Sequence, residues 1–180
     1  MRLITALLML AAYVGTASAA PPSQCASVAT HKRLVEIERR LLDTEERLVV
    51  MQKSLAEEAN EARRARNFDT REQLLAEMEL VTLLRSVLNY VSYNAHGALM
   101  LADARDFMRD PQDLWAVMDL LSEVSSQTLI AISDAQRHTP EVSAGTKRPG
   151  IATEASKFQD FLTEVTPIFK ACTEPDTGHH

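Results

Sequence analysis

The stretch LVEIERRLLDTEERLVVMQKSL, residues 34–55, decides the fold. Its apolar residues recur in alternating steps of three and four, which is the period of an amphipathic α-helix. This main row consists of Leu34, Ile37, Leu41, Thr44, Leu48, Met51 and Leu55. A second row flanks it and consists of Val28, Val35, Leu42, Val49 and Ala56. Together the rows form a wide apolar stripe, which predicts a helix in a bundle rather than in a strict two-stranded coiled coil.

The helical period continues through the rest of the chain, and no alternating strand pattern interrupts it. The sequence predicts an all-α protein with helices over about 27–66, 69–108, 111–138 and 151–171. Asp110 and Pro111 suit the N-cap and the first position of the third helix. TPEVSAGTKRPG, residues 139–150, is predicted to be a loop. Short connections favour antiparallel neighbours, so we expect an up-down-up-down four-helix bundle with a long first hairpin.

The first two predicted helices are longer than the last two, so their hairpin should project beyond the others at one end. The projecting part would cover residues 56–78, and an exposed tip that carries apolar side chains is a candidate partner surface. The residues assigned to this surface are Glu57, Glu61, Arg64, Phe68, Arg71 and Leu74.

The first 19 residues have the pattern of a secretory signal peptide: Arg2, an apolar run, and Ala17-Ser18-Ala19 before the cleavage point. We expect residues 20–174 to form one domain and residues 175–180 to form a disordered tail. The protein would then work in the periplasm or outside the cell. The absence of any Asn-x-Ser/Thr sequence favours a bacterial periplasm.

Cys25 and Cys172 are the two cysteines of the chain. In an oxidising compartment an even pair predicts a disulfide bond. In an up-down-up-down bundle the start of the first helix and the end of the fourth lie at the same end. The predicted topology and the predicted disulfide therefore agree.

The stretch NYVSYNAHG, residues 89–97, places polar side chains in the middle of the second predicted helix. Counted along their helices, several polar residues fall at nearly one height and predict a buried polar layer: Thr44, Tyr90, Asn94, Ser125 and Thr128. Such a layer can fix the register of a bundle. The alternative is a small-ligand pocket lined by the same residues.

The chain has 19 basic and 25 acidic residues and no basic stripe, which disfavours nucleic-acid binding. No membrane span, metal-ligand spacing, cofactor motif or catalytic motif is recognisable. An enzyme with a charged pocket inside the bundle would need convergent charged side chains, and Arg105 is the one clear candidate. The sequence therefore favours a non-enzymatic protein-binding module, either an immunity or inhibitor-type protein or an accessory of an envelope complex. A small-ligand-binding or sensor bundle is the alternative, and the protein could be a monomer or a homodimer.

Overall fold

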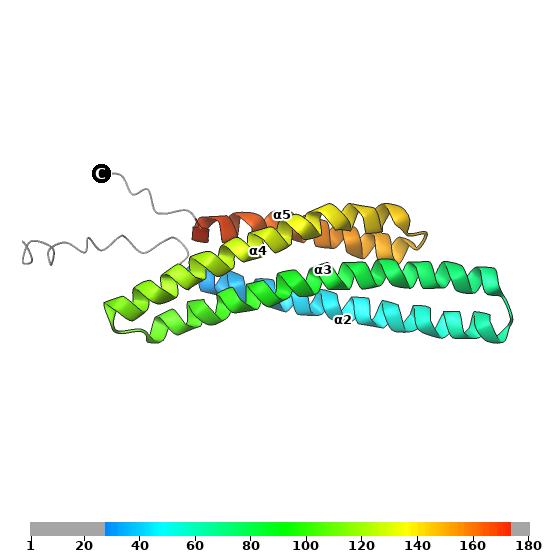
Figure 1. Ribbon diagram of the computed structural model, residues 1–180, viewed down its shortest axis with the longest axis horizontal. Coiled ribbons are helices and arrows are strands. Elements are labelled where there is room, and N and C mark those ends of the chain that lie inside the picture. The colour runs from blue at the N-terminus through cyan, green and yellow to red at the C-terminus, as the bar shows by residue number, and fades with distance from the viewer. Residues whose placement is uncertain (1–27, 174–180) are drawn as a thin grey trace, which may run out of the picture.

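The computed structural model describes residues 28–173, and four helices account for nearly all of them. Their bounds are α2, Val28–Arg64; α3, Phe68–Phe107; α4, Pro111–Gly145; and α5, Pro149–Thr173. Successive helices run in opposite directions, and the start of α2 lies at the same end as the end of α5 (Figure 1). The prediction of an all-helical protein with four packed helices is confirmed for this part of the chain. The predicted signal peptide, Cys25 and the predicted tail lie outside the described residues.

The core follows the main row of the first helix. Leu34, Ile37, Leu41, Leu48 and Leu55 are all buried. α3 adds Val81, Leu84, Leu88 and Val91, and α5 adds Phe158, Leu162, Val165 and Phe169. Each set has the three- and four-residue steps of a helix that buries one face.

The predicted loop at residues 139–150 is wrong, because α4 continues through Pro140 to Gly145. Thr139 and Val142 are buried on the core face of α4, one turn and two turns after buried Ala135. The Thr139 hydroxyl donates a hydrogen bond to the carbonyl of Ala135 at 2.6 Å. Pro140 is exposed and removes only one backbone donor. Core packing on both sides of the proline therefore outweighs its local helix-breaking tendency.

The connection between α4 and α5 is a short turn that is fixed to α3 by a buried carboxylate. Glu77 accepts hydrogen bonds from the hydroxyl of Thr146 and from the backbone N–H of Lys147, the latter at 2.8 Å. Arg148 ties the same turn to α2, because its guanidinium donates to both carboxylate oxygens of Glu58, at 3.0 and 2.5 Å. The turn is therefore held by both helices of the α2/α3 hairpin.

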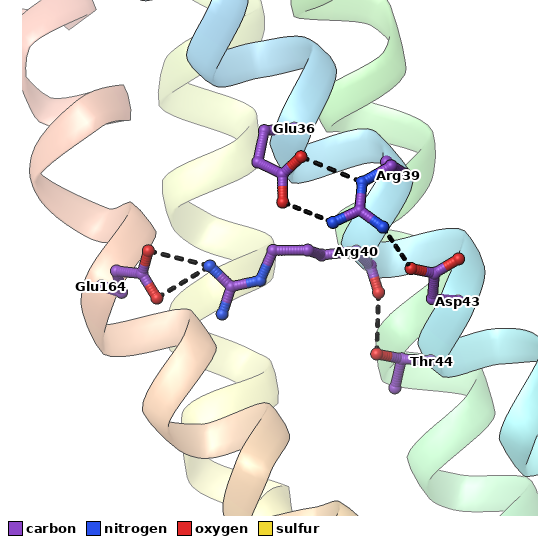
Figure 2. Close-up of polar contacts among 6 residues, drawn as sticks. All are labelled: Glu36, Arg39, Arg40, Asp43, Thr44 and Glu164. Atoms are coloured by element: carbon purple, nitrogen blue, oxygen red, sulfur yellow. Dashed lines mark hydrogen bonds and ion pairs between the residues drawn. The ribbon is translucent and has the colours of Figure 1, made fainter.

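Arginine side chains bridge α2 and α5. Figure 2 shows Arg40 extending from α2 to Glu164 of α5, where one guanidinium nitrogen lies 2.8 Å from each carboxylate oxygen. The same guanidinium carbon lies 4.6 Å from the centroid of the Phe161 ring, in a cation–π arrangement. Farther along, Arg47 donates to Glu154 of α5 at 2.8 Å.

Glu154 is the most buried carboxylate of this α2–α5 contact, and Lys157 also donates to it at 2.8 Å. Burial alone would raise the pKa of Glu154, but the hydrogen bonds from Lys157 and Arg47 outweigh burial and hold this pKa below its ordinary value of 4.5. A carboxylate whose folded-state pKa is depressed stabilises the fold above its unfolded pKa. That stabilisation is lost as the pH falls through the folded-state value.

We expect Glu154→Gln to lower the free energy of unfolding by about 1–3 kcal/mol at neutral pH, because the charge-assisted hydrogen bonds are lost. The difference from the unmodified protein should begin to shrink below about pH 4.5, where the unfolded side chain becomes neutral, and should disappear as the pH falls through the lower folded-state pKa. Urea unfolding at a series of pH values measures this. Glu164→Gln, at a largely exposed position, should have a much smaller effect. If the free energies of unfolding of Glu154→Gln and of the unmodified protein fell by equal amounts as the pH is lowered, ionised Glu154 would not stabilise the fold.

The bundle is offset at its two ends. The α2/α3 hairpin projects past the α4–α5 turn (Figure 1), and because the turn contacts Glu58 and Glu77, residues 59–76 lie beyond it. At the other end α4 projects past α5, because α4 has 35 residues and α5 has 25. At a rise of 1.5 Å per residue the projection is about 15 Å.

Candidate functional site

The five residues of the predicted polar layer do not form a connected layer. Only Ser125 and Thr128, both on α4, are fully buried, and Tyr90 lies at the surface, contrary to the prediction. Asn94 is half-buried, and its amide donates to the backbone carbonyl of Tyr90 at 2.8 Å. Thr44 is also half-buried and donates to the backbone of its own helix. No hydrogen bond between side chains joins any two of the five, so the structure brings together no polar pocket at this height.

Ser125 is the one member of this set whose hydroxyl is buried without a hydrogen-bond partner. A buried, unsatisfied hydroxyl is destabilising, so Ser125→Ala should raise the free energy of unfolding by about 1 kcal/mol relative to Ser126→Ala. The exposed neighbour Ser126 is a matched control, because both substitutions change helix propensity equally. Denaturant unfolding of the two variants measures the difference. A loss of stability in Ser125→Ala would mean that the hydroxyl has a partner, such as a bound ligand.

A shallow cavity of about 290 Å³ opens elsewhere, between α4 and α5. Small and polar side chains line it: Thr139, Pro140, Ser143, Ala144, Ala155, Ser156 and Gln159. The Thr139 hydroxyl is already bonded within its helix, whereas the side-chain oxygen of Gln159 is buried without a partner. The lining holds no charged group, which makes it a weak site for catalysis.

The predicted partner surface at the α2/α3 tip carries little exposed apolar area. Leu74 is predicted to belong to this surface but is 5% exposed, and it is part of the same buried core as Ala59 and Ala62 of α2. Glu57, Glu61 and Arg64 are exposed and Arg71 is half-buried. Phe68 is the one large apolar side chain of the six that faces solvent. The tip is therefore a mostly charged surface with one exposed aromatic ring and a partly exposed Leu75.

A larger apolar surface runs along the outer edge of the α2/α3 hairpin. It consists of Val35 and Leu42 on α2 and Tyr93, Met100 and Phe107 on α3, which are 45–82% exposed. We call this set the α2/α3 strip. On both helices its members are spaced by seven residues, the repeat of a helix that contacts another helix along one line.

Two contacts between an acidic residue and a histidine fix how the two halves of the strip lie beside each other. Glu38 of α2 contacts His96 of α3, and His31 Nδ1 lies 3.0 Å from Asp103 Oδ1 without the alignment of a hydrogen bond. Steps of three and four residues place 31, 35, 38 and 42 on one face of α2, and 93, 96, 100, 103 and 107 on one face of α3. The exposed apolar residues thus share faces with residues that touch across the α2/α3 contact.

The antiparallel run of the helices then sets the heights within the strip. Leu42 follows Glu38 by one turn and Tyr93 precedes His96 by one turn, so these two apolar residues lie at one level. Val35 and Met100 lie at one level on the other side of the Glu38–His96 contact. The strip is a two-helix surface with apolar pairs on both sides of a central Glu38–His96 contact.

Charged residues beside the strip are paired within the chain. Figure 2 shows Arg39 between Glu36 and Asp43, with nitrogen–oxygen distances of 2.7–2.9 Å. The hydrogen bond from Arg39 holds the pKa of Glu36 below its ordinary value, and the same bond raises the pKa of Arg39. The edge of the strip therefore carries charges that already have partners.

The spacing of the apolar residues of the strip is visible in the sequence, but the sequence analysis does not identify them as an exposed surface. Val35 and Leu42 were assigned to the flanking row of the core, yet they face solvent. The repeat of seven in Tyr93, Met100 and Phe107 was not assigned at all. A single contact with the bundle cannot bury two apolar rows of one helix. The apolar residues that stay exposed on α2 form part of the strip.

Comparison with protein-family models, with curated proteins and with solved structures finds no match to this chain. Between residues 28 and 173 no helix combines the length and the apolar content needed to cross a bilayer. The same residues contain no group of three or more His, Cys, Asp or Glu side chains arranged to hold a metal ion.

Proposed function

We propose that this protein is a secreted, non-enzymatic, helical protein-binding module that docks a partner on the α2/α3 strip. The observation that carries the proposal is the strip itself: five large apolar side chains, two of them aromatic, are exposed along two neighbouring helices. Tyr, Phe and Met are enriched in protein interfaces, and contiguous exposed apolar surface is uncommon without a binding role. An immunity or inhibitor-type role, or an accessory role in an envelope complex, would use such a surface.

The seven-residue spacing also supports a helical partner. A helix that lies along the strip would meet apolar side chains once every two turns on each side. Such a partner would present its own apolar residues in steps of three and four. The α2/α3 tip, with Phe68 and its surrounding charges, would then be a secondary contact rather than the main one.

Secretion and the disulfide belong to the same proposal. The signal-peptide pattern of residues 1–19 supports export to the periplasm or beyond. Cys172 is buried at the end of α5, and this supports its pairing with Cys25. Such an intramolecular disulfide would close nearly the whole mature chain. Mass spectrometry of the protein from its own host should show a chain that begins at Ala20 and lacks two hydrogens. A mass that includes both thiol hydrogens would refute the disulfide.

The binding surface is tested by photocrosslinking in the cells that produce the protein. A photoreactive amino acid at Tyr93 should give a crosslinked complex, and one at Ile130 should not, because Ile130 is also exposed but lies on α4, away from the strip. The crosslinked species would be identified by mass spectrometry. Equal crosslinking from both positions, or none from Tyr93, would refute the strip as the docking surface.

A small-ligand-binding bundle is the second candidate, because the hydroxyl of Ser125 and the side-chain oxygen of Gln159 are buried without partners. A ligand that satisfied Ser125 would raise the melting temperature, and Ser125→Ala should abolish that shift. A ligand-dependent shift of this kind would favour the second candidate over the protein-binding module.

A further inference from the structure

We infer that the α2/α3 strip docks a single amphipathic helix of a partner protein, and that this helix carries Lys or Arg along the edge that faces α2. The inference rests on the proposed function, because it takes the strip to be a protein-docking surface and adds the chemistry of the partner. The charge around the strip, the side on which that charge lies and the size of the strip each support it.

Acidic side chains predominate around the strip. Two cationic side chains, Lys32 and Arg39, share the exposed face of α2 with Val35 and Leu42, because these four residues follow one another in steps of three and four. The carboxylates on or beside the strip are more numerous, five against two: Glu36, Glu38, Asp43, Glu46 and Asp103. The surroundings of the strip therefore carry a net negative charge while their histidines are neutral.

Contacts within the chain do not remove this charge. Arg39 bonds both Glu36 and Asp43, but its single positive charge offsets only one of them. Glu38 and Asp103 contact histidines, which are charged only when protonated, so both carboxylate charges remain in mildly alkaline solution. A partner with Lys or Arg beside its apolar residues would complement this charge, whereas an acidic partner would be repelled.

The negative charge at the strip is local and does not merely reflect the acidic composition of the chain. At the α2/α3 tip, residues 61–72 contain four arginines and three carboxylates: Arg63, Arg64, Arg66 and Arg71, with Glu61, Asp69 and Glu72. One end of the hairpin is thus slightly basic, and the strip toward its other end is acidic. A cationic helix would be directed to the strip rather than to the tip.

The charge also lies on one side of the strip. Glu36, Asp43 and Glu46 belong to α2, whereas residues 86–102 of α3 contain no Asp, Glu, Lys or Arg. A partner helix above the line of contact between α2 and α3 would pack apolar side chains on Tyr93 and Met100 of α3. Its cationic residues would then belong on the opposite edge, over α2.

The strip has room for one helix rather than for a second folded domain. Tyr93 to Phe107 covers two heptads, roughly 21 Å along α3, and two packed helices are roughly 20 Å wide. The resulting footprint of roughly 420 Å² is about half of the roughly 800 Å² that each partner buries in a typical complex of globular proteins. A helix of about 14 residues matches the length of the strip and can contact α2 and α3 together.

Fluorescence anisotropy with two designed peptides tests the inference. The Lys peptide is a labelled helix of about 18 residues with Leu in steps of three and four and Lys elsewhere, and the Glu peptide has Glu in place of each Lys. At low salt and about pH 8, the protein should bind the Lys peptide roughly 10-fold or more tightly than the Glu peptide. Added salt should reduce that ratio. Equal affinity for the two peptides, or tighter binding of the Glu peptide, would overturn the inference.

Substitutions test whether the Lys peptide binds on the strip. Glu46→Lys should weaken its binding roughly 3–10-fold, whereas Glu123→Lys, the same change at an exposed position of α4, should weaken it less than about 2-fold. Met100→Glu should weaken binding although it adds a negative charge, because it removes an apolar contact from the strip. Ile130→Glu is its control on α4 and should not weaken binding. Equal losses in the strip variants and their controls would overturn the strip as the binding site.

The inference and the proposed function can fail separately. A crosslink from Tyr93 to a partner segment that lacks Lys and Arg, or to a second copy of this chain alone, would overturn the cationic helix and leave protein docking on the strip standing. The absence of any crosslink from Tyr93 in the producing cells would refute the proposed function, even if the Lys peptide binds as expected.

Discussion

Replacing Leu41 with alanine should lower the free energy of unfolding by about 3–4 kcal/mol, whereas Leu42→Ala should lower it by less than about 1 kcal/mol. The two leucines are neighbours on α2, so they share helix propensity and chain position. Leu41 is 1% exposed in the core, and its truncation leaves a cavity that the packed bundle fills only in part. Leu42 is 54% exposed on the strip and loses little burial within one chain.

Urea unfolding at low protein concentration measures these effects, because any binding to the folded state would add apparent stability. Similar losses of single-chain stability in both variants would contradict the placement of the two rows. They would mean that Leu42 is also packed inside a single copy.

Glu77→Ala should lower the free energy of unfolding by about 2–4 kcal/mol, an unusually large effect for a glutamate. The buried carboxylate accepts from the Thr146 hydroxyl and the Lys147 backbone N–H, and Arg148 donates its own N–H to Thr146 at 3.0 Å. Removing the carboxylate leaves the N–H of Lys147 without its acceptor in a half-buried site. The α4–α5 turn would also lose one of its two attachments to the hairpin.

Glu79→Ala provides the matched control, because Glu79 is exposed on the same helix and should change stability by about 0.5 kcal/mol or less. Glu77→Gln keeps one carbonyl oxygen as an acceptor and should recover part of the loss. Thermal or denaturant unfolding of the three variants, with hydrogen exchange at Lys147, gives the measurement. Equal effects at 77 and 79 would show that the carboxylate does not hold the turn.

The main row of residues 34–55 was sufficient to predict the first helix and its core, since Leu34, Leu41, Leu48 and Leu55 are buried as their spacing implies. Whether the residues of the second row are buried could not be predicted in the same way. Val35 and Leu42 repeat with the same period, and periodicity does not tell which of two adjacent rows meets a neighbouring helix. Burial is decided by where α3 and α5 lie, which is tertiary information.

Two other features depended on contacts that are distant in sequence. Pro140 predicts a helix end by local rules, but the burial of Thr139 and Val142 keeps α4 intact across it. Glu77 resembles any other glutamate of a long helix, and its importance comes from partners about 70 residues away. The predicted polar layer is wrong at Tyr90 for a related reason. The sequence gives the height of a residue along its helix, but it does not tell whether the side chain faces the core or, as Tyr90 does, the solvent.

The unequal lengths of α4 and α5 determine what fluorescence can report about this protein. Trp115 is the only tryptophan, and it lies half exposed in the part of α4 that extends past the end of α5. Its emission will therefore follow the opening of the first turns of α4, whereas circular dichroism follows all four helices. A fluorescence transition that precedes the dichroism transition would reflect the position of this residue, and should not be taken as a sign of a folding intermediate.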